Sequence, residues 1–305
     1  MGHLIQELEE KGLIRPPSWL ATNVHFLGVN GSEAYGCSSG NSDRDIYGFC
    51  IPRKDIVFPH LAGVVLGFDT DYERFDQFIA HHIQDGAMEY DVTVFSIVKY
   101  FALLRGNNPN ILDSLWIPQR CVLHITKIGQ LVREKRKVFL SKKLWHTFKS
   151  YAFSQLHKAK SKNRIGKRKE EVEKHGTDRK FLYHVLRLMD EVEQLLATGD
   201  MDITRDRERL KAVRRGDISE EEVVRIFEAK EKDLEKLYES SVLPYSPDDD
   251  KIKALLLQCL EEHYGSLREC VVDQNIAEKT LREVSTLLQE RLRLLDRPAA
   301  GSVSA

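Results

Sequence analysis

The chain has 305 residues, an apolar content of 42% and a formal net charge of -1, so it can bury a substantial core and suggests two domains or one with a large helical extension. A charge near zero argues against a globally basic nucleic-acid binder. The lack of a long apolar stretch or a signal-peptide core argues against a membrane protein and predicts a cytoplasmic location. Its five cysteines form no Cys-x-x-Cys pair, which argues against a disulfide framework or a zinc site.

In the first part of the chain, Gly and Pro separate short segments, a pattern typical of an α/β structure. Residues 24–29 predict a buried strand that runs into a loop of small and polar residues over positions 30–42. Residues 45–51 predict the next strand, which ends at Pro52, and residues 89–95 predict a third strand by strict alternation. In that third strand Glu89, Asp91 and Thr93 share one face, and residues 96–104 then show helical spacing.

The later part predicts long charged helices with few strand signals. Apolar residues recur at helical intervals from Phe181 to Leu196, and Gly199 follows as a stop. Ser219 and Glu222 match a capping box at the start of another helix. The prediction is therefore an α+β fold, with a small mixed β-sheet domain over residues 1–118, an all-α helical domain over 119–297 and a disordered tail over 298–305.

The most informative stretch joins Gly31-Ser32, after a gap, to Ser42-Asp43-Arg44-Asp45. Glycine permits close approach of the backbone to a triphosphate, and loop amides with the Ser32 hydroxyl are suited to phosphate oxygens. Asp43 and Asp45, two residues apart on a strand, project from the same face. Two adjacent carboxylates repel each other unless a cation lies between them, so this pair predicts a divalent metal site.

A third carboxylate is expected, because two metal ions are typical of nucleotidyl transfer. Asp91 is the first candidate, since its strand can lie beside that of Asp43 and Asp45, and Glu89 on the same face is the alternative. The expected cofactor is Mg²⁺ as two ions, with Mn²⁺ as an alternative, and an NTP is the expected substrate.

Structural explanations compete with these assignments. Asp43 and Asp45 suit a turn cap, and Asp91 suits the solvent side of an edge strand. Lys180, His184 and Arg187 share one helical stripe, which fits either phosphate binding or a solvated face. Lys99 and the basic stretch over residues 142–180 likewise fit either phosphate binding or a solvated surface. We interpret His60, His81 and His82 as incidental.

These residues resemble the DNA polymerase β-like nucleotidyltransferases, whose signature is Gly-Ser or Gly-Gly, a gap, and Asp-x-Asp or Asp-x-Glu. The resemblance over residues 20–225 is to the nucleotidyltransferase family linked to an RNA-repair pathway. It rests on Gly31-Ser32-Glu33-Ala34-Tyr35-Gly36, Ser42-Asp43-Arg44-Asp45-Ile46-Tyr47-Gly48, Tyr90-Asp91, Lys99, Asn107-Asn108-Pro109-Asn110, Asp113, Lys180, His184, Arg187 and Gly199.

The resemblance implies Gly31 and Ser32 at the triphosphate, Asp43 and Asp45 on both metal ions, and Asp91 on the acceptor-side ion. The residues expected to bind the nucleotide are Gly31, Ser32, Ser42, Lys99, Lys180, His184 and Arg187.

The predicted reaction moves an NMP from an NTP to an acceptor hydroxyl and releases pyrophosphate. An RNA or tRNA-like end is the expected acceptor. The alternatives are nucleotidylation of a protein side chain and a non-catalytic RNA-binding module. Which NTP is used, whether addition is templated and how many subunits assemble stay open.

Overall fold

The computed structural model describes residues 2–38, 43–65, 73–160, 178–270 and 275–295. The chain divides into two compact units. The first combines Met1–Arg53 with Phe75–His263, and the second combines Lys54–Arg74 with Tyr264–Ala305. The domain boundary expected at residue 118 falls inside the first unit, and the expected tail over residues 298–305 lies outside the described residues.

The first unit contains a five-stranded sheet of order β3-β4-β2-β1-β5. Strands β2 and β4 are parallel, whereas the β1/β2, β1/β5 and β3/β4 pairs are antiparallel. The prediction of an α+β fold with a mixed sheet is therefore confirmed. The strands are β1 (Val24–Val29), β2 (Arg44–Cys50), β3 (Gln77–Asp85), β4 (Met88–Ser96) and β5 (Val122–Ile125).

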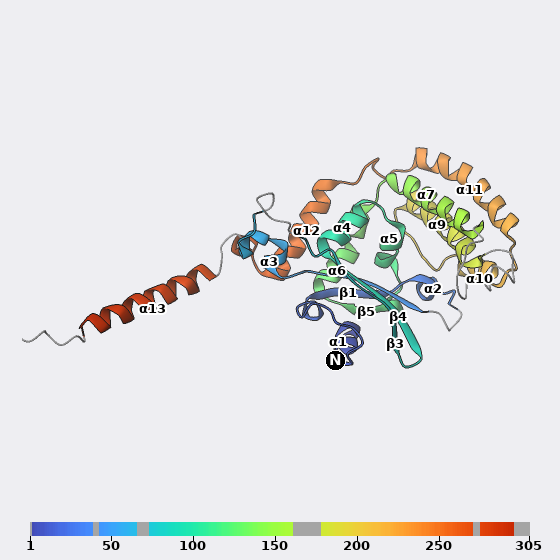
Figure 1. Cartoon of the computed structure of the whole chain (residues 1–305). Helices are drawn as coiled ribbons and strands as arrows, with labels where there is room; N and C mark the ends of the chain where they lie inside the picture. Colours follow the sequence, from blue (N-terminus) through green and yellow to red (C-terminus); the bar gives the residue numbers. More distant parts are fainter. Residues whose placement is uncertain (1, 39–42, 66–72, 161–177, 271–274, 296–305) are drawn as a thin grey trace, which may run out of the picture. The chain divides into compact units, whose positions relative to one another are not determined.

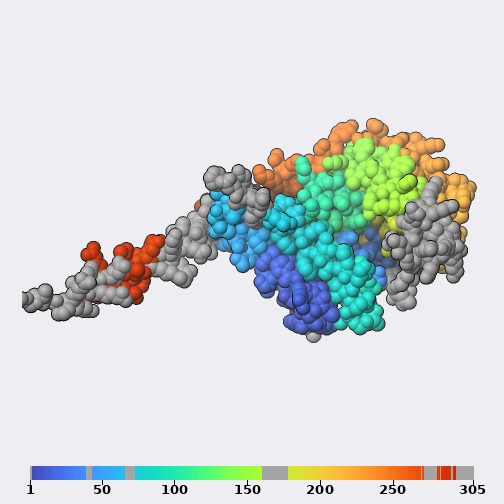
Figure 2. Space-filling view, viewed as in Figure 1, coloured from blue at the N-terminus to red at the C-terminus, as the bar shows by residue number. Residues whose placement is uncertain are grey.

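Helices α4, α5 and α6 pack against the strands, and α7, α9, α10 and α11 gather beyond one end of the sheet (Figure 1). Figure 2 shows the β3–β4 hairpin (cyan) and α7 (yellow-green) at different ends of the face drawn. The α-helices of this unit are α1 (Leu4–Glu10), α2 (Gly31–Ala34), α4 (Ile97–Arg105), α5 (Pro109–Trp116), α6 (Lys127–Glu134), α7 (Lys143–Lys160), α9 (Arg179–Thr198), α10 (Arg207–Arg215), α11 (Glu220–Ser240) and α12 (Asp249–Tyr264, whose last residue belongs to the second unit). Short 3₁₀ turns lie at Ala21–Asn23, Gln119–Cys121 and Arg136–Phe139.

Three predicted strands are present, and two further strands come from segments without a strand signal. β1 has the predicted bounds, and β2 and β4 differ from prediction by one residue at each end. β3 lies at the sheet edge with only Ile83 buried, so its sequence lacks the apolar alternation that marks a half-buried strand. β5 has four residues and comes after residue 118, in the part expected to be all-α. The expected loop after β1 contains the short helix α2.

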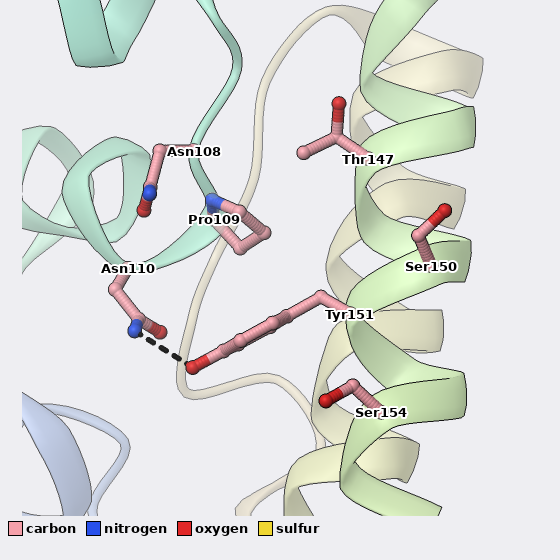
Figure 3. Close-up of a pocket in the computed structure, with 7 residues that line it drawn as sticks. All are labelled: Asn108, Pro109, Asn110, Thr147, Ser150, Tyr151 and Ser154. Carbon is pink, nitrogen blue, oxygen red and sulfur yellow. Dashed lines mark hydrogen bonds between the residues drawn. The ribbon is translucent and has the colours of Figure 1, made fainter.

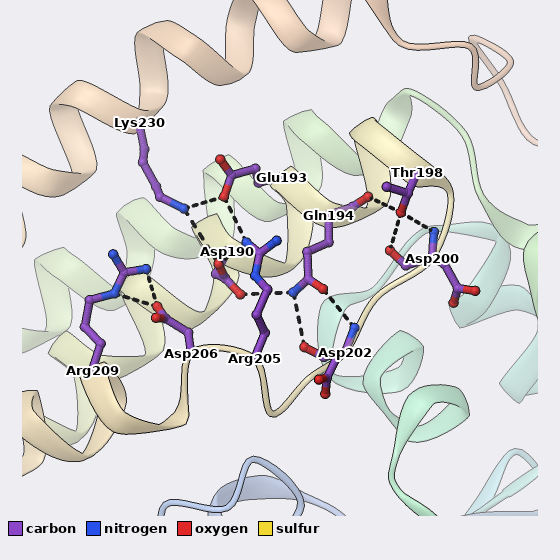
Figure 4. A network of polar contacts seen from close by, with 10 residues as sticks. All are labelled: Asp190, Glu193, Gln194, Thr198, Asp200, Asp202, Arg205, Asp206, Arg209 and Lys230. Atoms are coloured by element: carbon purple, nitrogen blue, oxygen red, sulfur yellow. Dashed lines mark hydrogen bonds and ion pairs between the residues drawn. The ribbon is translucent and has the colours of Figure 1, made fainter.

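Helix α9 is the central helix of the helical part, because α7, α10 and α11 all pack against it. Its predicted stop is confirmed, since Gly199 caps it at a φ of 64°. Beyond its first turn even its polar side chains are mostly buried, and they are held by a network that joins α9 to the segment before α10 and to α11 (Figure 4). In that network Arg205 pairs with Asp190, and Lys230 on α11 lies 2.6 Å from Glu193. Ser219 caps α11 as predicted, by accepting the Glu222 N–H.

The second unit contains α3 (Lys54–Val57), the 3₁₀ turns Pro59–Ala62 and Leu267–Cys270, and α13 (Asn275–Leu295). His60 donates from Nε2 to the carbonyl of Cys270 at 2.9 Å, which ties its two chain segments together. Across the described part of the chain, no helix has the length and apolar character needed to cross a membrane.

Candidate active site

Asp45 and Asp91 lie directly opposite each other in the parallel pairing of β2 with β4. Directly paired residues of neighbouring strands project from the same face of a sheet, so both carboxylates point to one side. Asp43 comes two residues before Asp45, and continuing the register places it beside Glu89. The sheet therefore brings all three predicted carboxylates, and the alternative Glu89, to one place.

The Gly31 turn lies against the Asp45 side chain. The Asn30 N–H donates to the main-chain oxygen of Asp45 at 2.7 Å, which fixes the start of the turn on β2. Gly31 has a φ of 64°, and a Cβ added to it would lie 2.5 Å from Asp45 Oδ2. Only glycine fits there on both grounds. Ser32 follows within α2 and is half-buried, whereas Ser42 lies outside the described residues.

The Asp45 carboxyl is largely buried, and charged groups of both signs act on it. Burial raises the pKa of the Asp45 carboxyl above its usual value, and the neighbouring Asp91 and Asp43 raise it further. The Lys180 ammonium opposes this rise, which places the first turn of α9 within electrostatic reach of the carboxylates. These groups therefore favour a cation beside Asp45.

The donor set fits a hard divalent cation, because such ions prefer carboxylate oxygens. In the described part of the chain, no three His, Cys, Asp or Glu side chains stand close enough together to enclose a metal as they are. Asp45 and Asp91 nonetheless face each other across paired strands, and burial, with a smaller effect of Asp91 and Asp43, raises the pKa of Asp45 although Lys180 opposes the rise.

Two histidines that we interpreted as incidental lie beside the carboxylates. The backbone N–H of His82 donates to Asp91 Oδ1 at 2.8 Å, and His81 Nδ1 lies 3.4 Å from the same oxygen. His82 Nδ1 is 2.7 Å from Glu89 Oε1, and this hydrogen bond lowers the pKa of Glu89. The signal that would have found them is the Gly86 turn, which marks residues 77–96 as a hairpin.

An ion pair fixes the Gly31 turn from the other side. Arg44 on β2 donates from Nε and Nη2 to the Glu33 carboxylate of α2, at 2.9 and 3.3 Å. Because Arg44 lies between Asp43 and Asp45 in sequence, its side chain leaves the strand on the opposite face from theirs. Glu33 was given no role from the sequence, and the structure shows that it anchors α2 on β2.

Arg187 is buried in a cluster of its own rather than presented on an open stripe. Its Nη1 is paired with Asp113 and lies 2.8 Å from Glu191 Oε2, and its guanidinium stacks 4.7 Å from the ring of Tyr35. Tyr35 donates to Asp113 at 2.7 Å. The stripe of Lys180, His184 and Arg187 exists, but α9 is exposed at Lys180, half-buried at His184 and buried at Arg187 as its neighbours close around it.

Lys99 lies away from the carboxylates. It is in the first turn of α4, after the end of β4, and its Nζ is 3.5 Å from Asp76 Oδ2. Asp91 precedes that end of β4 by five residues, about 16 Å of strand. The ring of His184 lies 4.2 Å from that of Tyr183, the residue before it on α9.

Part of the basic stretch over residues 142–180 is engaged by α11. Lys149 pairs with Glu231 and Glu235 at 2.6 and 2.9 Å, and Lys142 donates to the carbonyl of Glu239. Lys149 and the acidic residues of α11 therefore neutralise one another, whereas Lys142 binds a main-chain oxygen and keeps its charge. Residues 161–177, in the middle of this stretch, lie outside the described residues.

Comparisons with known proteins identify a family for most of the chain. The model of the RNA repair pathway DNA polymerase β family matches residues 6–266. A solved structure of a nucleotidyltransferase-like protein from Exiguobacterium sibiricum matches at 9% identity and a TM-score of 0.28, covering 77% of this chain and 73% of that chain. A search of curated proteins finds no significant match.

Proposed function

The chain belongs to the RNA repair pathway DNA polymerase β family and is a nucleotidyltransferase of that kind, and we propose that it transfers an NMP from an NTP to the hydroxyl of an RNA or tRNA-like end. The observation that carries this proposal is the pairing of Asp45 with Asp91, with Gly31 against the Asp45 carboxylate. The acceptor oxygen attacks the α-phosphorus, the bond to the bridging oxygen of the β-phosphate breaks, and pyrophosphate leaves. The hydroxyl proton passes to a carboxylate or to water.

Asp43, Asp45 and Asp91 would hold the divalent ions of this reaction, Mg²⁺ or Mn²⁺, with Glu89 as the alternative third carboxylate. When bound, such ions neutralise the charge that develops on the attacking and leaving oxygens. Asp45 and Asp91 have fixed positions because β2 and β4 are held in register by seven consecutive pairs from Arg44↔Tyr90 to Cys50↔Ser96. Rigid strands hold reacting groups more precisely than loops do.

Gly31 and Ser32 would take the triphosphate, since their turn is fixed on β2 beside Asp45. Lys180 would add a positive charge from the first turn of α9, as its effect on the pKa of Asp45 indicates. Ser42 and His184 stay in the proposed nucleotide site from the sequence. We assign Arg187 to a positioning role, because its guanidinium is occupied by Asp113 and Glu191.

RNA is the proposed acceptor because the family is one of RNA repair. The engagement of Lys142 and Lys149 by α11 leaves fewer basic side chains for a phosphate backbone. The phosphate backbone of the RNA would therefore bind lysines elsewhere in the basic stretch over residues 142–180. We keep the cytoplasmic location expected from the sequence as part of this proposal.

The test is incubation of the full chain with Mg²⁺ and each α-labelled NTP, alone and with total RNA. We expect labelled RNA from the wild type and none from Asp43→Asn or Asp45→Asn. Labelled protein instead of RNA would change the acceptor to a side chain. Undiminished labelling by both variants would refute the assigned site, and no labelling by the wild type in any arm would favour a non-catalytic RNA-binding module.

A further inference from the structure

A pocket of about 340 Å³ opens between the start of α5 and one face of α7 (Figure 3). From α5 come an asparagine-rich turn and a proline. From α7 comes a stripe of hydroxyl side chains with helical spacing, in which Tyr151 reaches across to α5. The lining residues are Asn108, Pro109, Asn110, Thr147, Ser150, Tyr151 and Ser154.

The chemistry of this lining is polar but uncharged. It offers amides, hydroxyls, one aromatic ring and one proline ring, and its lining residues include no acidic or basic side chain. In the described part of the chain the hydroxyls of Ser150 and Ser154 make no hydrogen bond, so both are open to a ligand. Such a surface suits a neutral ligand with a flat ring and several hydroxyls, and it does not suit a phosphate.

Hydrogen bonds connect the pocket to the Gly31 turn. Asn110 donates to the Tyr151 hydroxyl at 3.1 Å and accepts from Arg187 at 3.5 Å. Arg187 then pairs with Asp113, which also accepts from Tyr35 directly after α2. Asn110, which holds Tyr151 across the pocket, therefore belongs to the network that supports the Gly31 turn.

Tyr47, which follows Asp45 by two residues on β2, interacts electrostatically with both the pocket and a carboxylate. Burial raises the pKa of Tyr47 to about 12, and the neighbouring Asp45 and Tyr151 raise it further. Tyr47 is thus within electrostatic reach of both a candidate catalytic carboxylate and the aromatic ring of the pocket.

We propose that this pocket binds a nucleoside, with the base against the Tyr151 ring and the polar edges on Asn110, Ser150 and Ser154. The inference rests on the proposed function, because a nucleotidyltransferase must place a neutral nucleoside next to charged phosphates. The volume lies at the small end of the range for ligand pockets, about 300–1,000 Å³, as expected for one nucleoside. The nucleoside belongs either to the NTP or to the terminal residue of the acceptor.

The first experiment measures the affinity of the full chain for adenosine, guanosine, cytidine and uridine, without metal or triphosphate. Ser150→Trp should fill the pocket and lower the affinity for the preferred nucleoside at least tenfold. Tyr151→Ala should lower that affinity at least tenfold by removing the ring. Tyr151→Phe, which keeps the ring, should lower the affinity less. Ser240→Trp makes the same change at an exposed helical serine outside the pocket and should leave affinity unchanged.

Steady-state transfer then identifies the source of the nucleoside. A raised KM for the NTP in Ser150→Trp assigns the pocket to the NTP, and a raised KM for the acceptor assigns it to the acceptor end. Unchanged nucleoside affinity and unchanged KM values in both Ser150→Trp and Tyr151→Ala would overturn the inference and leave the proposed function standing. Nucleoside binding that Ser150→Trp abolishes, in a wild type that transfers nothing, would support the pocket and refute the function. A wild type that binds no nucleoside would overturn the inference whether or not it transfers.

Discussion

Asp45 on β2 and Asp91 on β4 are direct partners in a parallel pairing, although 46 positions separate them in the sequence. Their side chains leave the sheet on the same face, where Asp43 and Glu89 lie next in register. Negative charge is concentrated at one edge of the site, and Lys180 opposes it from α9. The site is therefore arranged to receive cations and phosphates together.

Replacing Asp45 by asparagine should separate activity from stability. Because burial and the other carboxylates raise the pKa of Asp45, the ionised group is unfavourable in the metal-free fold, and Asp45→Asn should melt at or above the wild-type temperature. Transfer should fall roughly a thousandfold or more, since several kcal/mol of transition-state stabilisation would be lost. Mg²⁺ should raise the melting temperature of the wild type but not of Asp45→Asn.

Asp85→Asn serves as the control for that change, because Asp85 pairs with Lys11 at the outer end of β3. It should keep both the transfer activity and the response to Mg²⁺. An Asp45→Asn protein that melts well below the wild type would contradict the electrostatic account of the site.

The substitution Gly31→Ala should disturb the site through one steric clash. The new Cβ would lie 2.5 Å from Asp45 Oδ2, on a residue already at a φ of 64°. We expect a loss of about 1–3 kcal/mol of stability and at least a tenfold loss of transfer. Gly12→Ala is the matched control, because Gly12 has a φ of 71° and nothing within 4 Å of the added Cβ. Equal effects of the two variants on transfer would show that the contact with Asp45 has no importance.

Lys180→Gln should weaken the nucleotide site without weakening the fold. Lys180 is exposed on the first turn of α9, yet its charge acts on Asp45. Loss of that charge should lower kcat/KM for the NTP by roughly tenfold to a hundredfold, since a charge-assisted contact is worth about 1.5–3 kcal/mol. Lys211→Gln removes a partly exposed charge on α10 and should leave kcat/KM unchanged. Equal kcat/KM values for Lys180→Gln and Lys211→Gln would contradict the assignment of Lys180 to the site.

Arg187→Met should be a stability variant. It leaves Asp113 and Glu191 buried without their cation, and both carboxyls already have a raised pKa because of burial. Breaking such a pair typically costs about 3–5 kcal/mol, which chemical denaturation measures directly. A variant that unfolds like the wild type but has a raised KM for the NTP would restore the nucleotide-binding role expected from the sequence.

The sequence predicted well those features that depend on one strand or one helix. The apolar run of β1 and the alternation around Asp91 gave correct strands, and the helix from Phe181 ends at Gly199 as expected. The contacts made between distant segments were not predictable in the same way. β3 is an edge strand with one buried side chain, so apolar alternation did not predict it. Without the β3–β4 pairing, the position of His82 beside Glu89 could not be predicted.

The burial of Arg187 has a related cause. Helical spacing groups Lys180 with Arg187, but it does not reveal how many neighbours surround the helix. Because α7, α10 and α11 enclose α9, its polar side chains need partners inside the protein, and Asp113 from α5 supplies one of them. Sequence spacing alone carries no information on that enclosure.

Acidification should destabilise the first unit through His25 on β1. Burial, with a smaller effect of His263 and His124, lowers the pKa of His25 to about 3, and its Nε2 lies 3.0 Å from His263 Nδ1. The folded state keeps His25 neutral, while the unfolded chain takes up a proton below about pH 6.5. The contribution of neutral His25 to the free energy of unfolding is therefore fully present above pH 6.5. It is lost as the pH falls towards 3, and about 2 kcal/mol is lost at pH 5. Urea unfolding between pH 8 and 5 should show a steeper loss for the wild type and for the exposed-site control His157→Gln than for His25→Gln. Parallel pH profiles for wild type and His25→Gln would contradict this, because a neutral buried imidazole must bind its proton on unfolding.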